Sequence, residues 1–366
     1  MRRLTCLDGV RGVLALYVMA SHILPFAVLP GGWGWLGSLL SHGGAAVDMF
    51  FVLSGLVILR SLQAFQGRPG AFLLARASRI FPVYLLAFAV AVAIRPFDHG
   101  IVAMPWIAPD SPTRLLVSDG WPDTALVEIG VHLVMLHGLF PDGVLPHAWV
   151  RFLGAAWSLS TEWQFYVLAL GLACWRVRES RLVMVFLLLA AIGLGWHMMA
   201  PAGWQFSRAF LPNKAQYFAL GIASAALLAR GRAAWPGYML TLMAAMAISF
   251  DQGGWGKLAA PLAWTVCLGA QLGVLGKLAW MLRHPVLLWL GAISYPLYIA
   301  HEPIHKLLSI ALAAVASGDA VLFSLLWLPA AVLVPVLAAW GLHVAVELPA
   351  QRWGRGRAGR PALAGA

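Results

Sequence analysis

Apolar runs of helix length recur along the whole chain. They lie at roughly 10–29, 43–61, 80–97, 155–175, 182–199, 212–229, 235–250, 257–280, 285–306 and 320–346. Each is close to the ~20 residues that a helix needs to cross the hydrocarbon core of a bilayer. A shorter run at 127–139 predicts a re-entrant or interfacial helix. The pattern predicts an all-α, polytopic transmembrane helix bundle of about ten spans, forming a single membrane domain at 1–351.

Composition agrees with a chain surrounded by lipid. Hydrophobic residues make up 61% of the sequence, charged residues only 11%, and the mean hydropathy is +0.81. A soluble domain carries roughly 25% charged residues, so this chain could not cover a water-facing surface. The 18 tryptophans suit the membrane–water interfaces. The three cysteines, Cys6, Cys174 and Cys267, have no metal-ligand or redox spacing.

The basic residues predict the orientation of the bundle. With ten spans and a cytoplasmic N-terminus, 18 of the 25 lysines and arginines fall on the cytoplasmic side and 7 on the other. This is the bias that the positive-inside rule requires, with both termini in the cytoplasm. The net charge of +11 therefore reflects topology and lipid contact, and no nucleic-acid partner is expected. The basic tail at 352–366 is predicted to be cytoplasmic, disordered and attracted to anionic lipid.

Two ionisable residues share one face of the first span. Arg11 and His22 are eleven residues apart, very close to three helical turns. At 1.5 Å per residue they lie ~16 Å apart along the axis, with Arg11 near the cytoplasmic end. Ionisable groups within a span are costly, so they usually face a cavity and serve a function. This pair is the first candidate for a site.

Further polar residues are predicted at the depth of His22. Asp48, Glu162 and His301 all fall in the outer half of their spans. A histidine can take a proton from a hydroxyl, and a carboxylate on its other ring nitrogen would orient it. Asp48 or Glu162 is therefore expected to orient His22. At the inner end, Arg76 and Arg79 are expected to join Arg11 in a cluster suited to phosphates.

Each of these residues also has a structural explanation. The histidine on the first span would then make an interhelical hydrogen bond, and the two acids would complement helix dipoles. The arginines near the inner end would only mark topology, and His301 would lie at the interface. The shared face of Arg11 and His22 favours a functional interpretation, because a scaffold gains nothing from buried charge.

Six stretches in order along the chain resemble acyltransferase family 3, the integral membrane transferases that O-acylate glycans, lipids and antibiotics. Single stretches are weak evidence, but six in register are specific. The stretches are Leu7-Asp8-Gly9-Val10-Arg11-Gly12 followed by His22, Val47-Asp48-Met49-Phe50-Phe51-Val52-Leu53-Ser54-Gly55, Arg76-Ala77-Ser78-Arg79-Ile80-Phe81-Pro82-Val83-Tyr84, Trp157-Ser158-Leu159-Ser160-Thr161-Glu162-Trp163-Gln164-Phe165-Tyr166, Ile293-Ser294-Tyr295-Pro296-Leu297-Tyr298-Ile299-Ala300-His301 and Val346-Glu347-Leu348-Pro349.

The resemblance implies an acyl-CoA donor, usually acetyl-CoA, that binds from the cytoplasm as a co-substrate rather than as a resident cofactor. It implies that His22 is the essential base and that Arg11, Arg76 and Arg79 bind the donor. The separation of Arg11 and His22 is comparable to an extended pantetheine arm. Phosphates would then lie at the arginines while the thioester reaches His22.

The resemblance also implies a bacterial inner-membrane enzyme whose acceptor is a glycan or lipid-linked oligosaccharide. No fused hydrolase-like domain is expected, and in this respect the chain resembles stand-alone members that modify exopolysaccharide or lipopolysaccharide. An exopolysaccharide repeat unit is the expected acceptor. His301, Tyr298 and Trp157 are expected to contact it, with an aromatic face stacked on a sugar.

Alternatives remain open at this level. Transfer is expected to be direct, with a covalent acyl-enzyme on Ser21, Ser54 or Ser160 as the mechanistic rival. A glycolipid transporter or flippase without acyl transfer would also place polar groups at mid-depth.

Overall fold

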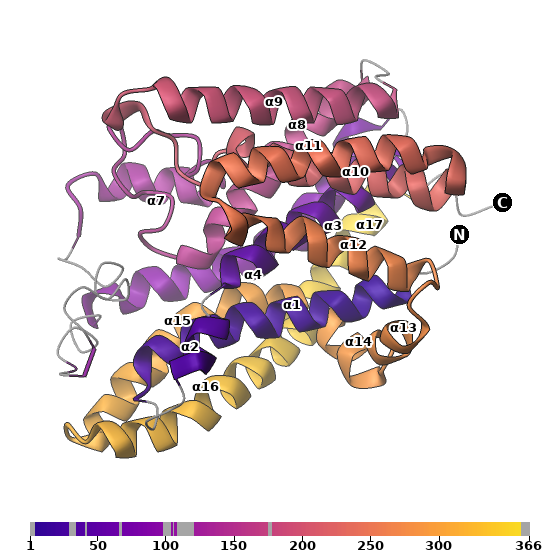
Figure 1. Ribbon diagram of the computed structural model, residues 1–366. Coiled ribbons are helices and arrows are strands. Elements are labelled where there is room, and N and C mark those ends of the chain that lie inside the picture. Colours follow the sequence, from indigo (N-terminus) through magenta and orange to yellow (C-terminus); the bar gives the residue numbers. More distant parts are fainter. Residues whose placement is uncertain are drawn as a thin grey trace.

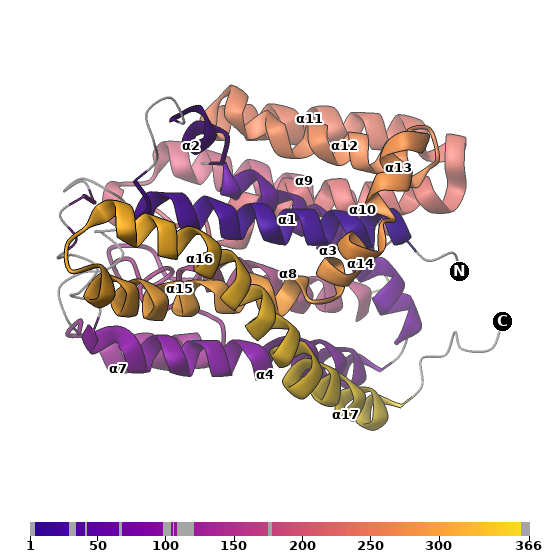
Figure 2. The same cartoon turned by 90° about the horizontal axis from the view of Figure 1, so that it is seen from below.

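The long helices run along one common direction and form a single bundle (Figure 1). The computed structural model describes residues 4–28, 34–40, 42–65, 68–97, 104, 106–107, 121–174 and 178–359. Helices α1 (Thr5–Ile23) and α17 (Leu348–Ala358) begin and end the described chain. The start of α1 and the end of α17 lie at the same end of the bundle (Figures 1 and 2). We call this the proximal end and the opposite one the distal end.

The chain is helical almost throughout its described parts. The helices between α1 and α17 are α2 (Gly34–Leu40), α3 (Gly43–Ala64), α4 (Pro69–Ile94), α7 (Ala125–Leu133), α8 (Trp157–Cys174), α9 (Glu179–Met199), α10 (Ala215–Arg230), α11 (Trp235–Gly253), α12 (Ala259–Gln271), α13 (Gly276–Leu282), α14 (Pro285–Ala292), α15 (Ser294–Ala316) and α16 (Ala320–Leu342). Within the described ranges the β-type pairing is one isolated bridge between Pro141 and Phe206.

The predicted fold class is confirmed. Among the described residues, seven helical segments are long and apolar enough to cross a membrane, and an eighth is added if the bent pair α12 and α13 counts as one span. One of the seven, Leu211–Gly253, contains both α10 and α11, which pack against each other. The protein is therefore an all-α, polytopic membrane bundle, while the number of ten spans and the side on which the termini lie stay predictions.

Three details differ from the prediction. The span expected at 285–306 is two helices, because the chain leaves helical geometry at Ile293 between α14 and α15. The span expected at 257–280 bends by 93° between α12 and α13. The tail expected to be disordered from residue 352 is helical as far as Ala358, where α17 packs along α4 (Figure 2). Residues 360–366 of this tail lie outside the described part of the chain.

Large apolar side chains cover the outside of the bundle. On α9, Leu188 is 56% exposed, and on α16 Leu337 is 64% exposed. Such side chains have favourable surroundings only in lipid, because a soluble protein rarely exposes large contiguous apolar patches. The exposed faces of α9 and α16 are therefore lipid-facing.

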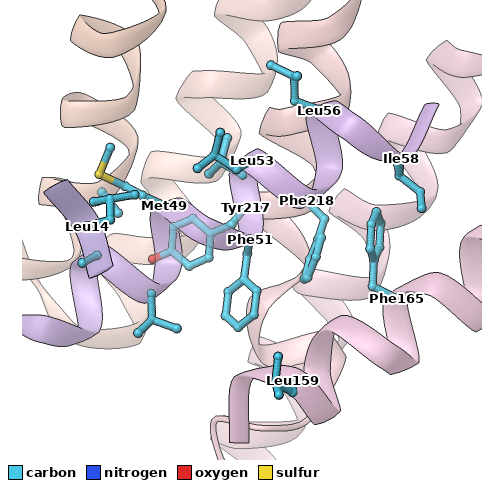
Figure 3. Close-up of a cluster of buried hydrophobic side chains, with 14 of the residues drawn as sticks. Leu14, Met49, Phe51, Leu53, Leu56, Ile58, Leu159, Phe165, Tyr217 and Phe218 are labelled. Carbon is cyan, nitrogen blue, oxygen red and sulfur yellow. The ribbon is translucent and has the colours of Figure 1, made fainter. Parts of the chain in front are cut away.

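Aromatic side chains fill the interior where α3, α8 and α10 meet (Figure 3). The rings of Phe165 and Phe218 stack at a centroid distance of 4.0 Å, and Phe51 lies 5.1 Å from Phe218. All three are almost completely buried. This packing fixes α3 and α8, which both contribute side chains to the site described below.

Glycines let α3 and α10 approach backbone to backbone. A Cβ atom on Gly221 of α10 would lie 2.1 Å from the carbonyl oxygen of Val52, and one on Gly55 of α3 would lie 2.3 Å from that of Phe218. Small residues at such crossings are the usual way for membrane helices to gain close contact. The crossing brings α3, which carries Asp48 and Ser54, into a fixed register with α10.

Gly221→Ala is expected to destabilise the protein by about 1–3 kcal/mol, because the new methyl group forces the two backbones apart. Thermal unfolding in detergent measures this as a lower Tm. Gly171→Ala on α8 is the control, since a Cβ there meets no atom within 4 Å. Equal Tm values for the two variants would contradict the tight crossing.

Candidate active site

A cavity lies inside the bundle between α1, α3, α4, α8 and α15. The centre of a water-sized sphere can move within a volume of about 130 Å³ inside it. We call it the arginine cavity. Leucine, valine, isoleucine and phenylalanine side chains form much of its wall, and its polar side chains come from Asp8, Ser54, Ser158, Ser294, Tyr166, Tyr295, Tyr298, Glu162, Arg11, Arg76 and Arg79.

The three arginines that were predicted to form a cluster all line this cavity. Arg11 comes from α1, and Arg76 and Arg79 come from the first half of α4. Arg76 donates a hydrogen bond to the Ser61 hydroxyl, and its guanidinium lies 5.0 Å from the centre of the Tyr166 ring. The Nε atom of Arg11 is buried and has no hydrogen-bond partner among the described residues. An unpaired buried donor costs about 1–3 kcal/mol, so Arg11 favours a ligand that supplies an acceptor.

Glu162 lies with the arginines. Its Oε1 accepts hydrogen bonds from the Ser54 hydroxyl at 2.5 Å and from the Tyr166 hydroxyl. It also lies close enough to Arg11 for an electrostatic attraction between them. The expectation that Glu162 orients His22 is therefore wrong, because its carboxylate is engaged in the arginine cavity. The prediction also put Glu162 at the depth of His22, whereas its carboxylate lies in the cavity that contains Arg11 and that His22 does not line.

His22 is oriented by its own helix. Its Nδ1 lies 2.8 Å from the carbonyl oxygen of Val18, one turn earlier on α1. Because a carbonyl only accepts, Nδ1 carries the proton in a neutral ring, and Nε2 is left as the basic nitrogen. The expected carboxylate partner is thus replaced by a backbone carbonyl, which sequence patterns do not reveal.

His301, which was predicted to lie at the depth of His22, lies next to it in the structure. Their ring centroids are 5.0 Å apart, and that of His301 lies 6.3 Å from the ring of Tyr298, which lines the arginine cavity. His301 is fully buried, donates from Nδ1 to the Leu297 carbonyl, and has no described partner at Nε2. His22 does not line the cavity itself, and it is joined to the cavity by His301 and Tyr298.

His305 extends this histidine cluster and was missed by sequence reasoning. Its ring lies 5.6 Å from that of His301, one turn earlier on α15. Its Nε2 donates to the Ala331 carbonyl of α16 at 2.8 Å, and its Nδ1 has no described partner. The spacing of four residues from His301 was the available signal.

Asp48 is paired with a lysine and not with His22. Its Oδ1 lies 2.6 Å from the Nζ of Lys214, at the start of α10, and both side chains are buried. The expectation that Asp48 orients His22 is therefore wrong. Sequence reasoning counted Lys214 only as a topology charge, because nothing in the sequence links position 48 to position 214.

Breaking this buried pair is expected to be costly. Asp48→Asn leaves the Lys214 ammonium buried without a counter-charge, which costs about 3–5 kcal/mol. The measurement is thermal unfolding in detergent. Glu179→Gln is the matched control, because the Glu179–Arg230 pair has the same 2.6 Å distance but is partly exposed and contributes little. If Asp48→Leu combined with Lys214→Met is as unstable as Asp48→Asn, the ion pair is not the cause.

Trp157 does not offer the open ring expected for sugar stacking. It is only 8% exposed, and its ring has the guanidinium of Arg208 at 5.8 Å and the ammonium of Lys214 at 5.6 Å. The edge of Phe51 packs against it at 5.7 Å. Trp157 thus holds two cations in place, and the Tyr298 hydroxyl is likewise engaged, 2.8 Å from that of Ser158.

The short helix expected at 127–139 is α7, at Ala125–Leu133, and it packs against the second half of α4. The carbonyl of His132 accepts a hydrogen bond from the Tyr84 hydroxyl, and the His132 ring stacks on Phe88 and on His137. Burial lowers the pKa of His132 to about 4, so this ring is neutral at physiological pH. Glu128 is paired with Arg151 at 2.9 Å. These partners give α7 a structural role.

The sequence can now be compared with known proteins. Residues 4–344 match a family model described as an acyltransferase domain. The chain belongs to acyltransferase family 3. This acyltransferase is also 37% identical over 95 residues to Protein 2 in picA locus of Rhizobium radiobacter, a match that covers 25% of this chain and 45% of that protein. No solved structure is significantly similar to the chain.

The motif stretches of this acyltransferase converge on the arginine cavity. Five of the six stretches named from the sequence supply residues to its wall, from α1, α3, α4, α8 and α15. The sixth carries Glu347, which interacts electrostatically with Arg11. Segments far apart in the sequence therefore surround one space, as expected if they act together.

Proposed function

We propose that this acyltransferase moves an acetyl group from acetyl-CoA to a hydroxyl of a glycan or lipid-linked oligosaccharide, with an exopolysaccharide repeat unit as the acceptor. The enzyme would lie in the bacterial cytoplasmic membrane with both termini in the cytoplasm, which the distribution of lysines and arginines supports. The proximal end of the bundle is then the cytoplasmic side, from which acyl-CoA enters. No resident cofactor is part of the proposal.

The observation that carries the proposal is the unpaired Arg11 Nε inside a cavity that also contains Arg76 and Arg79. Guanidinium groups bind phosphate oxygens through charge-assisted hydrogen bonds. The remaining wall is largely apolar, which suits a pantetheine arm and an acyl group. One ligand with both phosphates and an apolar arm satisfies both parts of the cavity, and acyl-CoA has this character.

In the proposed reaction, His22 acts as general base. Its Nε2 takes the proton of the acceptor hydroxyl, and the oxygen forms a bond to the thioester carbonyl carbon. The bond from that carbon to the CoA sulfur breaks, and the thiolate recovers the proton from the imidazolium. The Val18 carbonyl keeps the imidazole in the required tautomer, and the ring of His301 lies 5.0 Å from that of His22.

The alternative mechanism forms a covalent acyl-enzyme on a serine, and the three candidate serines differ in their surroundings. The Ser160 hydroxyl is fully buried and donates to the Met135 carbonyl, and that of Ser21 donates to the Val18 carbonyl. Ser54 lies in the arginine cavity and donates to Glu162, which is the arrangement that a nucleophile and a base require.

Radiolabelled acetyl-CoA tests the proposal directly. Membranes containing the protein are incubated with the labelled donor, with the cell's own glycans as acceptor, and compared with membranes that lack the protein. We expect label in the glycan fraction only when the protein is present. Movement of a glycolipid across the bilayer without consumption of donor would support a transporter instead.

A further inference from the structure

A second cavity opens at the distal end of the bundle, on the other side of α3. The centre of a water-sized sphere can move within a volume of about 290 Å³ inside it. We call it the distal cavity, and its lining residues are His42, Gly44, Ala45, Asp48, Arg208, Gly253, Gly256 and Lys257. Successive residues of α3 thus face different spaces, since Val47 and Phe50 line the arginine cavity while Asp48 lines the distal one.

The distal cavity carries an excess of positive charge. Its one carboxylate, Asp48, is already paired with Lys214. Arg208 and Lys257 have neither a hydrogen bond nor an ion pair with a described residue, and both lie close enough to Lys214 to repel it electrostatically. Three cations therefore surround one anion, which leaves two positive charges without a partner.

The two unpaired cations are held in place by packing. The guanidinium of Arg208 lies over the rings of Trp149 and Trp157, at 5.4 and 5.8 Å from their centres. The stem of Lys257 crosses the end of α11, where a Cβ on Gly253 would lie 3.0 Å from its Cγ. A charge whose position is fixed before the ligand arrives loses less entropy on binding. The positions of these two cations therefore favour the binding of an anion in the distal cavity.

The distal cavity is also next to the proposed base. Gly43, between the lining residues His42 and Gly44, packs so closely on α1 that a Cβ there would lie 2.3 Å from the Ser21 hydroxyl oxygen. Ser21 directly precedes His22. A molecule bound in the distal cavity is therefore separated from the His22 region by the first turn of α3.

We propose that the distal cavity binds an anionic group of the acceptor glycan, a carboxylate or a phosphate, with Arg208 and Lys257 as its ligands. This inference rests on the proposed function, because it assigns the acceptor to the distal end and the donor to the arginine cavity. The acceptor is accordingly an acidic saccharide, bound through its charge beside the hydroxyl that is acylated. A sugar hydroxyl also finds an acceptor in the cavity, the Asp48 carboxylate.

Equilibrium binding to the purified full-length protein tests the assignment. The probes are a glucuronate-containing tetrasaccharide, its methyl ester, which has the same shape without the charge, and glucose 1-phosphate. We expect the acid or the sugar phosphate to bind, and Arg208→Gln and Lys257→Gln each to weaken that binding at least about tenfold, as for a lost hydrogen bond to a charged group. Binding of the acid alone assigns the cavity to a uronate, and binding of the phosphate alone assigns it to a phosphate or lipid-linked end.

The control variant is Arg230→Gln, an exposed arginine paired with Glu179 at the proximal end. Equal binding of acid and methyl ester, or binding that Arg208→Gln leaves unchanged, would overturn the proposal. So would displacement of the saccharide by vesicles of phosphatidylglycerol but not of phosphatidylcholine, which would assign the cavity to a lipid headgroup.

Acetyl transfer is measured in parallel, so that failure of the two proposals can be told apart. Charge-dependent binding without transfer from any acyl-CoA would refute the proposed function and leave the anion site standing. Transfer to the methyl ester at the rate of the acid, unaffected by Arg208→Gln, would refute the anion site and leave the proposed function standing.

Discussion

His22→Gln is expected to lower the rate of acetyl transfer by about 10²–10⁴-fold, the usual contribution of a general base. Glutamine can still donate to the Val18 carbonyl, so the variant keeps the helix-bound hydrogen bond and loses only the basic nitrogen. The loss should appear mainly in kcat, because the arginines proposed to bind the donor are untouched. The measurement is steady-state transfer by the purified enzyme with saturating acetyl-CoA.

His197→Gln is the matched control for this experiment. His197 lies on α9, where its Nδ1 bonds to Gln205 in an exposed position, away from both cavities. Its replacement should leave kcat unchanged. Full activity of His22→Gln would remove His22 from the mechanism, and a protein that becomes acetylated by donor alone would replace direct transfer by the Ser54 route.

The length and position of the apolar runs predicted the fold class well, because the bilayer imposes a strong constraint on a membrane-spanning helix. A span must be long, apolar and fully hydrogen-bonded within itself, so its polar residues stand out. This is why Arg11 and the arginines of α4 could be assigned to one cluster before the structure was known. The break at Ile293 escaped notice because apolar residues continue across it and hydropathy does not change.

The residues that contact each polar side chain were harder to predict than the depth at which that side chain lies. Depth along a span follows from counting residues, and it correctly brought His22 and His301 to one level. The direction in which a side chain points depends on how helices are arranged around each other, and the sequence does not contain this directly. Asp48 and Glu162 were consequently assigned to His22, whereas the packing of α3 gives them Lys214 and Ser54 as neighbours.

Hydrogen bonds from side chains to backbone carbonyls could not be predicted from the sequence, for a different reason. Every residue carries a carbonyl, so the Val18 acceptor that orients His22 has no signature in the sequence. The unpaired Nε of Arg11 is likewise a fact of three-dimensional packing. It distinguishes Arg11 from the other arginines of the cluster, and this difference can be measured.

Arg11→Lys is expected to raise the KM for acetyl-CoA by about 10–100-fold with little change in kcat. Lysine keeps the charge but lacks both the Nε donor and the planar fork that matches a phosphate. Loss of a hydrogen bond to a charged group costs about 1.5–3 kcal/mol, which corresponds to this range. Because the interaction is made with the donor at rest as well as in the transition state, the loss should fall on KM.

A truncated donor shows whether the lost interaction involves the phosphates. Acetyl-pantetheine carries the same thioester and arm without the phosphates, so wild type and Arg11→Lys should have equal KM values for it. Arg355→Lys is the control, an exposed arginine on α17 outside the cavity, and should behave as wild type with both donors. An equal rise in KM for acetyl-CoA and acetyl-pantetheine would mean that Arg11 shapes the cavity rather than binding phosphate. An unchanged KM for acetyl-CoA would move the phosphate site to Arg76 and Arg79, whose guanidinium groups line the same cavity.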